Sequence, residues 1–248
     1  PQLQKRLQLP FIVHKTLLTS GIGESFLADM IEDWENKLPA NIKLAYLPNY
    51  GMVRLRLTGV DNDKAKLETQ ISQQFEVLQA LVKDYLVTNK DEPMEQVIAE
   101  MLLERNETIT TAESCTGGYI AHLLTSIPGS SAYYSGSIIS YSYEAKENML
   151  LVDKHTLETK GAVSEEVVTQ MVKGALKQMK TTYAIAVSGI MGPGGATDEK
   201  PVGTVWAAVG SDEKIVTHKF HFRFDRMKNI EWTAISVLNL LRRFIMGY

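Results

Sequence analysis

The stretch from Thr108 to Gly118 constrains the fold of this chain more than any other. It opens with a strand-like run, Ile109 to Ala112, passes through a polar turn and gives way to an apolar helical pattern over residues 120–124. A strand that ends in a tight turn before a helix leaves backbone N–H groups unpaired, which suits an anion or an oxyanion. Ser and Thr also favour helix starts for structural reasons alone, so a simple N-cap cluster is the alternative interpretation.

Strand-like and helical segments alternate after residue 92, which predicts an α/β layered domain with a central sheet and flanking helices. Strands are expected at 109–112, 133–143, 182–187, 202–209 and 214–224, and helices at 94–102, 112–126, 146–151, 164–179 and 230–245. The strand from Thr182 to Val187 is wholly apolar, as in strands buried on both faces. Gly136 is expected to mark a bulge, and Ser164 to cap the helix that follows it.

Residues 1–88 show a separate βαββα pattern, which predicts a small α+β module. Its strands are expected at 11–18, 42–47 and 52–58, and its helices at 26–34 and 67–85. The polar stretch from Thr88 to Pro93 is the expected boundary, so the predicted domains are 1–88 and 92–248.

Composition argues against several classes of protein. The net charge is −3, and residues 1–88 carry ten basic and ten acidic side chains, so neither nucleic acid nor an acidic membrane surface is an expected partner. No apolar run approaches the roughly 20 residues that span a bilayer. Cys115 is the only cysteine, which rules out an intrachain disulfide and favours a reducing, cytoplasmic compartment.

A glycine-rich loop follows the apolar strand. Ser188 leads into residues 189–195, where four of seven residues are glycines. The loop lacks the Lys-Ser/Thr pair of a phosphate-binding P-loop, and Thr197 stands where a dinucleotide fingerprint has its third glycine. A ligand loop at the carboxyl end of a strand and a simple turn both fit this pattern.

Ser114 is the candidate nucleophile, but the usual partners of a catalytic serine are missing from its neighbourhood. The chain has no Gly-x-Ser-x-Gly elbow, and no histidine lies near Ser114 in sequence. Lys146 is the candidate base, since a desolvated lysine can lose its proton near neutral pH. His218 and His221 would lie on opposite faces of a strand, and no ligand set has the spacing of a metal site.

Three stretches together resemble the C-terminal domain of the CinA family. They are Ala-Glu-Ser-Cys-Thr-Gly-Gly at 112–118, Tyr-Ser-Tyr-Glu-Ala-Lys at 141–146, and Ser-Gly-Ile-Met-Gly-Pro-Gly-Gly at 188–195 with Lys-Pro-Val-Gly-Thr-Val at 200–205. The likeness covers about residues 92–246. Residues 1–88 resemble the KH-like middle domain of longer members, notably at 21–25 and 53–57. The N-terminal domain of those members, similar to molybdopterin-binding domains, has no counterpart among these residues.

The resemblance implies an amidohydrolase that converts nicotinamide mononucleotide to nicotinate mononucleotide and ammonia, a step of pyridine nucleotide salvage. It implies no cofactor and no metal, and we expect a homodimer. The serine that matches Ser114 is the nucleophile in the family, Tyr141 and Lys146 match residues that assist it, and Arg226 matches a phosphate contact. The other expected substrate-binding residues belong to the two loops: Glu113, Cys115, Thr116, Gly117, Ser188, Gly189, Gly192, Gly194 and Gly195. Many relatives carry Asn at the position of Tyr143 and Arg at that of Ile230.

Two other functions remain open at this point. The KH-like module suggests a nucleic-acid-binding or competence-linked adaptor without catalysis, although residues 1–88 are electrically neutral and lack the Gly-x-x-Gly clamp of KH domains. A sensor that binds a pyridine nucleotide without hydrolysing it is the third interpretation. Retention of Ser114, Tyr141 and Lys146 argues against such a sensor.

Overall fold

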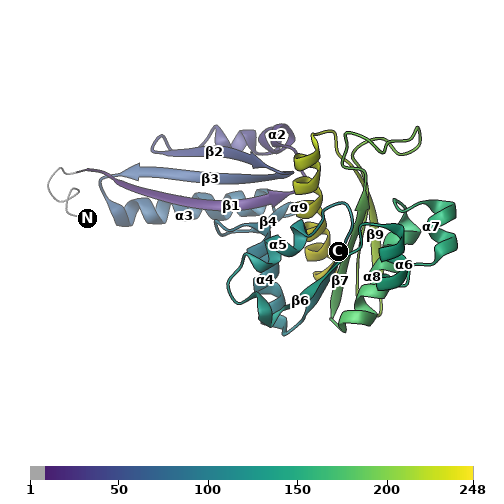
Figure 1. Ribbon diagram of the computed structural model, residues 1–248. Helices are drawn as coiled ribbons and strands as arrows, with labels where there is room; N and C mark the ends of the chain where they lie inside the picture. Colours follow the sequence, from purple (N-terminus) through teal and green to yellow (C-terminus); the bar gives the residue numbers. More distant parts are fainter. Residues whose placement is uncertain (1–8, 248) are drawn as a thin grey trace. The chain divides into compact units, whose positions relative to one another are not determined.

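The computed structural model describes residues 9–247, which divide into two compact units between Pro93 and Met94 (Figure 1). The division lies at the end of the polar stretch that precedes the first helix of the second unit. Among the described residues, no helix combines the length and the apolar character that crossing a membrane would require.

The first unit is a four-stranded antiparallel sheet with two helices packed on one face. Its elements are β1 (Phe11–Ser20), α2 (Glu24–Glu35), β2 (Ile42–Asn49), β3 (Met52–Asp61), α3 (Lys64–Leu81) and β4 (Leu86–Thr88), and the strand order is β2-β3-β1-β4. Leu55 and Leu57 alternate along β3 with a period of two and Leu17 of β1 is paired with Leu55; all three share one core with Leu27 of α2 and Phe75 of α3. The expected βαββα order is present. Its last helix ends earlier than predicted, and β4, only three residues long, follows it.

The second unit is built on a mixed five-stranded sheet in the order β6-β5-β7-β8-β9. Its elements are α4 (Met94–Arg105), β5 (Ile109–Glu113), α5 (Tyr119–Thr125), η1 (Ser130–Ala132), β6 (Tyr134–Ile139), α6 (Tyr143–Leu150), α7 (Lys154–Lys160), α8 (Glu165–Met179), β7 (Tyr183–Gly189), β8 (Thr204–Gly210), β9 (Ile215–His221) and α9 (Arg226–Ile245). Strand β5 runs parallel to β6 and to β7, whereas β8 and β9 are antiparallel additions.

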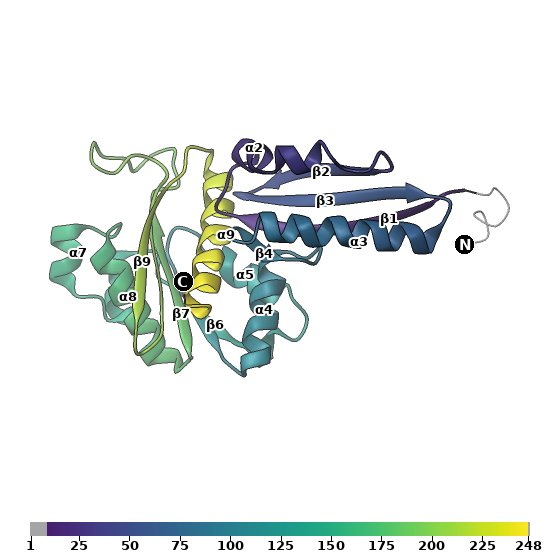
Figure 2. The same cartoon turned by 180° about the vertical axis from the view of Figure 1, so that it is seen from behind.

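Helices cover both faces of this sheet, as predicted for an α/β layered domain. Figure 2 shows α7 and α8 on one side of the sheet and α4, α5 and α9 on the other. The chain leaves β5 through α5 to reach β6, and it returns through α6, α7 and α8 to reach β7 on the opposite side of β5. At such a reversal the loops after neighbouring parallel strands diverge and leave a crevice, which is where α/β sheets bind ligands.

Several element boundaries differ from those expected. The helix predicted over 112–126 begins only at Tyr119, because residues 114–118 form the turn. Strand β6 is shorter than predicted, with a register shift between Tyr134 and Gly136 that is the expected bulge, and α7 was not predicted. Ser164 does occupy the N-cap of α8, but its hydroxyl donates to the Gly161 carbonyl rather than accepting from the helix.

Helices α6 and α8 approach each other closely at Gly174. A β-carbon built on Gly174 would lie 2.0 Å from the carbonyl oxygen of Leu150, the last residue of α6. No side chain fits between the two helices there, so glycine at this position sets how close α6 lies to α8 and to the sheet. Helix α6 carries Lys146 one turn before Leu150.

Candidate active site

The turn after β5 is held from inside by the carboxylate of Glu113, which is fully buried. One oxygen of this carboxylate accepts from the Thr116 hydroxyl at 2.6 Å and from the amides of Gly118 and Ile120 at 3.0 and 3.1 Å. The other accepts from the Thr111 hydroxyl and the Ala121 amide. The anion at the start of α5 is therefore Glu113 itself, since the first amides of a helix favour negative charge. Glu113 holds the turn and does not line the cavity described below.

Ser114 follows Glu113 directly and faces Lys146 of α6. The Nζ of Lys146 lies 3.0 Å from the Oγ of Ser114 and donates to the carbonyl oxygen of Ser140 at 2.7 Å. Ser114 continues the line of β5, because its amide donates to the Val187 carbonyl of β7. Two residues that are 32 positions apart in sequence thus come into hydrogen-bond contact at the carboxyl ends of neighbouring strands.

Lys146 is buried almost completely, with 1% of its surface exposed. Burial removes water from the ammonium group and lowers the pKa of Lys146 from its ordinary value of 10.5 to about 8. Among the described residues, no carboxylate forms an ion pair with Lys146 that would raise the pKa again. A substantial fraction of this amine is therefore neutral near physiological pH, which is the state in which it can accept a proton.

Cys115 lies beside Ser114 but in a different chemical environment. Its side chain is buried, and burial together with the charge of Glu113 raises the pKa of the thiol to about 12. Because the thiolate is the reactive form of cysteine, this thiol is a weak nucleophile at neutral pH. Ser114 has an adjacent buried amine, and Cys115 does not form a hydrogen bond with that amine.

Backbone amides near Ser114 could stabilise an oxyanion. The amides of Gly117 and Gly118 donate to the Ser114 carbonyl and to the Glu113 carboxylate, so neither is available to an oxyanion. Within residues 9–247, no carbonyl or carboxylate accepts from the amides of Cys115 and Thr116.

Gly189, at the end of β7, offers a third amide. The Ile190 amide donates to Thr204 of β8, so the N–H of Gly189 points to the opposite side, where β5 has already ended. A β-carbon on Gly189 would come within 2.8–3.0 Å of Val205, Thr204 and Met191, so a larger residue would displace this part of the wall.

A cavity of about 190 Å³ lies in front of the Ser114–Lys146 pair. It is lined by Ser114, Cys115, Tyr141, Lys146, Ala162, Val163, Ser188, Gly189, Met191 and Arg226. Seven of the residues expected from the sequence are brought together here. Ala162, Val163 and Met191 are apolar wall residues that the sequence analysis missed, because nothing in their residue type signals a site.

Arg226, the first residue of α9, stands at the rim of the cavity. It donates from Nη1 to the Gly192 carbonyl at 2.8 Å and from Nη2 to the Tyr141 hydroxyl at 3.0 Å. The structure therefore places Tyr141, which is 63% exposed, next to Arg226; no hydrogen bond joins its hydroxyl to Ser114 or Lys146 among the described residues. Gly192 contributes through its carbonyl only.

The remaining expected site residues lie outside the cavity. Thr116 is buried with its hydroxyl on Glu113, while Gly117, Gly194 and Gly195 are exposed and do not line the cavity. No cluster of three or more His, Cys, Asp or Glu that could hold a metal ion occurs within the described part of the chain.

Comparison with known proteins covers both units. The family described as the CinA C-terminal domain matches residues 91–245, and the family described as the damage-inducible protein CinA KH domain matches residues 14–88. A CinA-like protein of Cytophaga hutchinsonii is 44% identical over 242 residues, which are 98% of this chain and 58% of that protein. A CinA-like protein of Flavobacterium psychrophilum is 42% identical over 247 residues, 99% of this chain and 59% of that protein. The chain thus spans somewhat under three fifths of these curated relatives.

The matching solved structures cover a share of this chain that is about the length of the second unit. A CinA superfamily protein from Klebsiella pneumoniae is 33% identical with a TM-score of 0.61, covering 63% of this chain and all of that one. A competence/damage inducible protein from Agrobacterium tumefaciens is 37% identical with a TM-score of 0.58, covering 60% of this chain and 93% of that one.

Proposed function

The chain belongs to the CinA family, and on that premise we propose that its second unit is an amidohydrolase that hydrolyses the carboxamide of nicotinamide mononucleotide. The observation that carries the proposal is the buried contact of 3.0 Å between the Lys146 amine and the Ser114 hydroxyl. A desolvated lysine next to a serine, without a histidine, is a known arrangement for activating a hydroxyl nucleophile.

The proposed reaction proceeds in two stages. Neutral Lys146 takes the proton of Ser114 as its Oγ attacks the carboxamide carbon, and the amides of Cys115, Thr116 and Gly189 receive the oxyanion. The resulting ammonium of Lys146 protonates the departing nitrogen, which leaves as ammonia and gives an ester on Ser114. Water, deprotonated by Lys146, then attacks the ester, and collapse of the second oxyanion releases the carboxylic acid and restores the serine.

The apolar and charged parts of the cavity suit the two ends of the proposed substrate. Ala162, Val163 and Met191 provide apolar surface close to Ser114, where an aromatic ring that bears the carboxamide can lie. Arg226 provides a guanidinium at the rim, and guanidinium groups bind phosphate through paired hydrogen bonds. Tyr141 orients that guanidinium in this proposal, and Ser188 contributes a hydroxyl to the cavity wall.

Ammonia release tests the proposal directly. The chain is incubated with nicotinamide mononucleotide, with nicotinamide riboside and with glutamine, and ammonia and the acid product are measured. We expect turnover of the mononucleotide and little or none of glutamine. Absence of ammonia from both nicotinamide substrates, with the chain folded, would contradict the proposal.

Nucleic-acid binding by the first unit has one observation in its favour. A groove of about 510 Å³ is lined by His14, Lys15 and Arg56 together with Phe75, so it joins basic groups to an aromatic ring. Arg56, however, is paired with Asp91 at 2.9 Å, which leaves little net positive charge in the groove. We therefore propose a structural role for this unit; micromolar binding of short single-stranded RNA or DNA that weakens steeply with salt would contradict it.

A further inference from the structure

The loop between α7 and α8 forms the wall of the cavity at Ala162 and Val163. This wall is attached to α6, because the amide of Ala162 donates to the hydroxyl oxygen of Tyr143 at 3.2 Å. Within the loop, the Ser164 hydroxyl donates to the Gly161 carbonyl at 2.9 Å. The loop has four residues, 161–164, and Tyr143, which attaches it to α6, lies three positions before Lys146.

A second attachment comes from the glycine loop. That loop leaves the sheet at Ile190 and returns at Gly203, where the Gly203 amide donates to the Ile190 carbonyl at 2.7 Å. In its outer part, Thr197 and Lys200 exchange backbone hydrogen bonds of 3.0 and 3.2 Å, which close a turn. Residues 193–199 are exposed, but Lys200 is half-buried. Lys200, at the end of this turn, is therefore partly covered by the protein.

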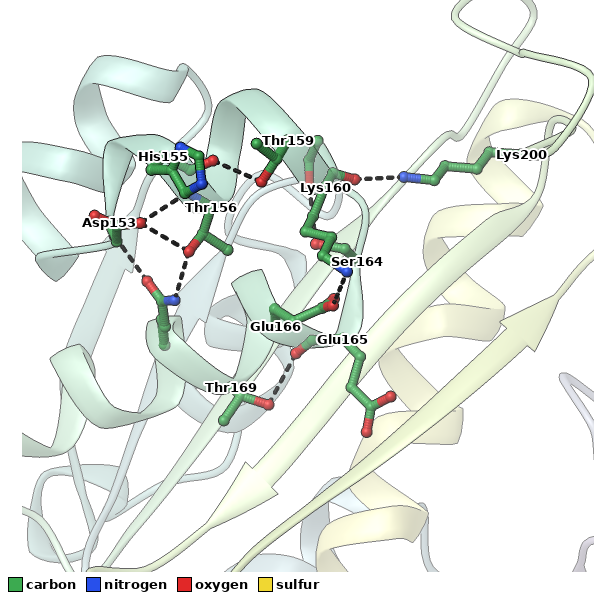
Figure 3. A network of polar contacts seen from close by, with 12 residues as sticks. Asp153, His155, Thr156, Thr159, Lys160, Ser164, Glu165, Glu166, Thr169 and Lys200 are labelled. Atoms are coloured by element: carbon green, nitrogen blue, oxygen red, sulfur yellow. Dashed lines mark hydrogen bonds and ion pairs between the residues drawn. The ribbon is translucent and has the colours of Figure 1, made fainter.

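Figure 3 shows where that side chain goes. The Nζ of Lys200 donates to the carbonyl oxygen of Lys160, the last residue of α7, at 2.7 Å. A terminal helix carbonyl lacks a partner within its helix, and a cation at this end is also favoured by the helix dipole. The side chain of Lys160 in turn pairs with Glu166 at the start of α8 at 3.0 Å, so the contact of Lys200 is made at the junction of both helices.

Lys200 and Tyr143 converge on a single point of this loop. A β-carbon on Gly161 would lie 3.5 Å from the Nζ of Lys200 and 4.0 Å from the hydroxyl oxygen of Tyr143. The two side chains thus flank the α-carbon that precedes Ala162. One comes from α6, which carries the candidate base, and the other from the loop whose Gly192 carbonyl accepts from Arg226.

We propose that Lys200 and Tyr143 are positioning residues that hold the Ala162–Val163 wall of the cavity, and that Lys200 couples this wall to the glycine loop. The inference rests on the proposed function, because it assigns the wall to substrate binding. Among the described residues neither side chain forms a hydrogen bond with Ser114 or Lys146; each acts through the loop. Their loss should therefore weaken substrate binding and leave the chemical step largely intact.

Steady-state kinetics with nicotinamide mononucleotide tests the coupling. Lys200→Met keeps the length of the side chain and removes the donor, and Lys200→Arg keeps a donor. Lys154→Met is the matched control, since Lys154 also lies on this part of the chain but forms only an exposed pair with Glu158 at 3.9 Å. We expect Lys200→Met to raise KM about fivefold, the usual effect of one hydrogen bond, with kcat within about twofold. Lys200→Arg should recover most of the loss, and Lys154→Met should behave as wild type.

Amide hydrogen exchange measures the stability of the α7–α8 loop without any substrate. Amides in a peptide spanning residues 157–165 should exchange about fivefold faster in Lys200→Met and in Tyr143→Phe than in wild type, and at the wild-type rate in Lys154→Met. A chain that releases no ammonia but shows this exchange pattern would contradict the proposed function and support the positioning role. Unchanged exchange in Lys200→Met, or a fall in kcat at constant KM, would overturn the inference.

Discussion

The two loops at the candidate active site are held in place in very different ways. The turn 113–118 is built around a buried carboxylate that accepts five hydrogen bonds. The glycine loop 190–203 is exposed at residues 193–199, and hydrogen bonds from Asn229 to the Met191 carbonyl, from Arg226 to the Gly192 carbonyl and from Lys200 to the Lys160 carbonyl attach it to the rest of the unit. The turn that carries Ser114 is thus held by its own buried carboxylate, whereas the outer part of the glycine loop, residues 193–199, is exposed and is held through contacts near its two ends. A rigid turn around Ser114 favours catalysis, and an exposed loop segment next to the cavity can move when substrate enters.

Removal of the nucleophile or the base should have the largest effect. Ser114→Ala and Lys146→Met should each lower kcat by at least about a thousandfold, and the double variant should cost little more than either single one, as expected for residues that act as a unit. Single-turnover ammonia release measures all three. Additive losses, or an active Ser114→Ala variant, would mean that the two residues do not form one catalytic pair.

Removal of the Glu113 carboxylate should destabilise the turn 113–118. Glu113→Ala leaves three backbone amides and two hydroxyls without their acceptor, which should lower the free energy of unfolding by about 3 kcal/mol. Urea unfolding of the whole chain measures the loss. Gly194→Ala is the matched change in the glycine loop, where a β-carbon meets nothing within 4 Å, and it should cost well under 1 kcal/mol. Equal losses in the two variants would remove the contrast between the loops.

The protonation state of the base should appear in the pH profile. Burial lowers the pKa of Lys146 to about 8, and only the neutral amine accepts a proton. The value of kcat/KM should therefore rise about tenfold per pH unit below pH 8 and level off above it. The profile is measured from pH 6.5, above the second pKa of the phosphate, which is about 6. A flat profile between pH 6.5 and 9 would exclude Lys146 as the base.

Substitution of Arg226, which contacts the glycine loop at Gly192, should weaken substrate binding. Arg226→Lys keeps the charge but loses the planar guanidinium that contacts both Tyr141 and Gly192, so KM for the mononucleotide should rise about tenfold. The riboside, which lacks the phosphate, should be a poor substrate for wild type and variant alike. Equal wild-type turnover of riboside and mononucleotide would remove Arg226 from phosphate binding.

The smallest effect is expected at Cys115. Its thiol has a pKa of about 12 and is buried, so Cys115→Ala should keep kcat within about twofold. Alkylation by iodoacetamide at pH 7.5, followed by mass spectrometry, should be slow in the folded chain. Rapid alkylation that abolishes ammonia release, together with an inactive Cys115→Ala variant, would reassign the nucleophile.

The fold was largely predictable because its strands and helices differ in period and composition. The apolar run of β7 and the strand-like run of β1 were both expected from the sequence, and the structure has strands at both places. Elements with weak local signals were missed: β4 has three residues, and α7 has a single buried residue, Leu157. Boundaries also shifted where a side chain competes with the backbone, as Glu113 does at the start of α5.

The candidate site was predictable as far as its residue types carry chemistry. Ser114, Lys146 and Arg226 could be named from the sequence. The contact of 3.0 Å between Ser114 and Lys146, however, depends on how closely α6 packs against α8 and the sheet, which no local sequence pattern encodes. Glu113 was expected to bind substrate as part of the turn that carries Ser114; only the structure shows that five donors already surround its carboxylate. Alanine and valine, as at Ala162 and Val163, carry no chemical signal at all.

The close approach at Gly174 has a consequence for how this site tolerates evolutionary change. The Leu150 carbonyl lies where a β-carbon of residue 174 would be, so any substitution at Gly174 would push the carboxyl-terminal end of α6 outward. Lys146 lies one turn before Leu150 on the same helix. Adding a single methyl group to α8 at this position would therefore shift α6 and change the distance between the Lys146 amine and the Ser114 hydroxyl. Gly174 does not line the cavity and carries no reactive group, yet its substitution would change the geometry of the Ser114–Lys146 pair.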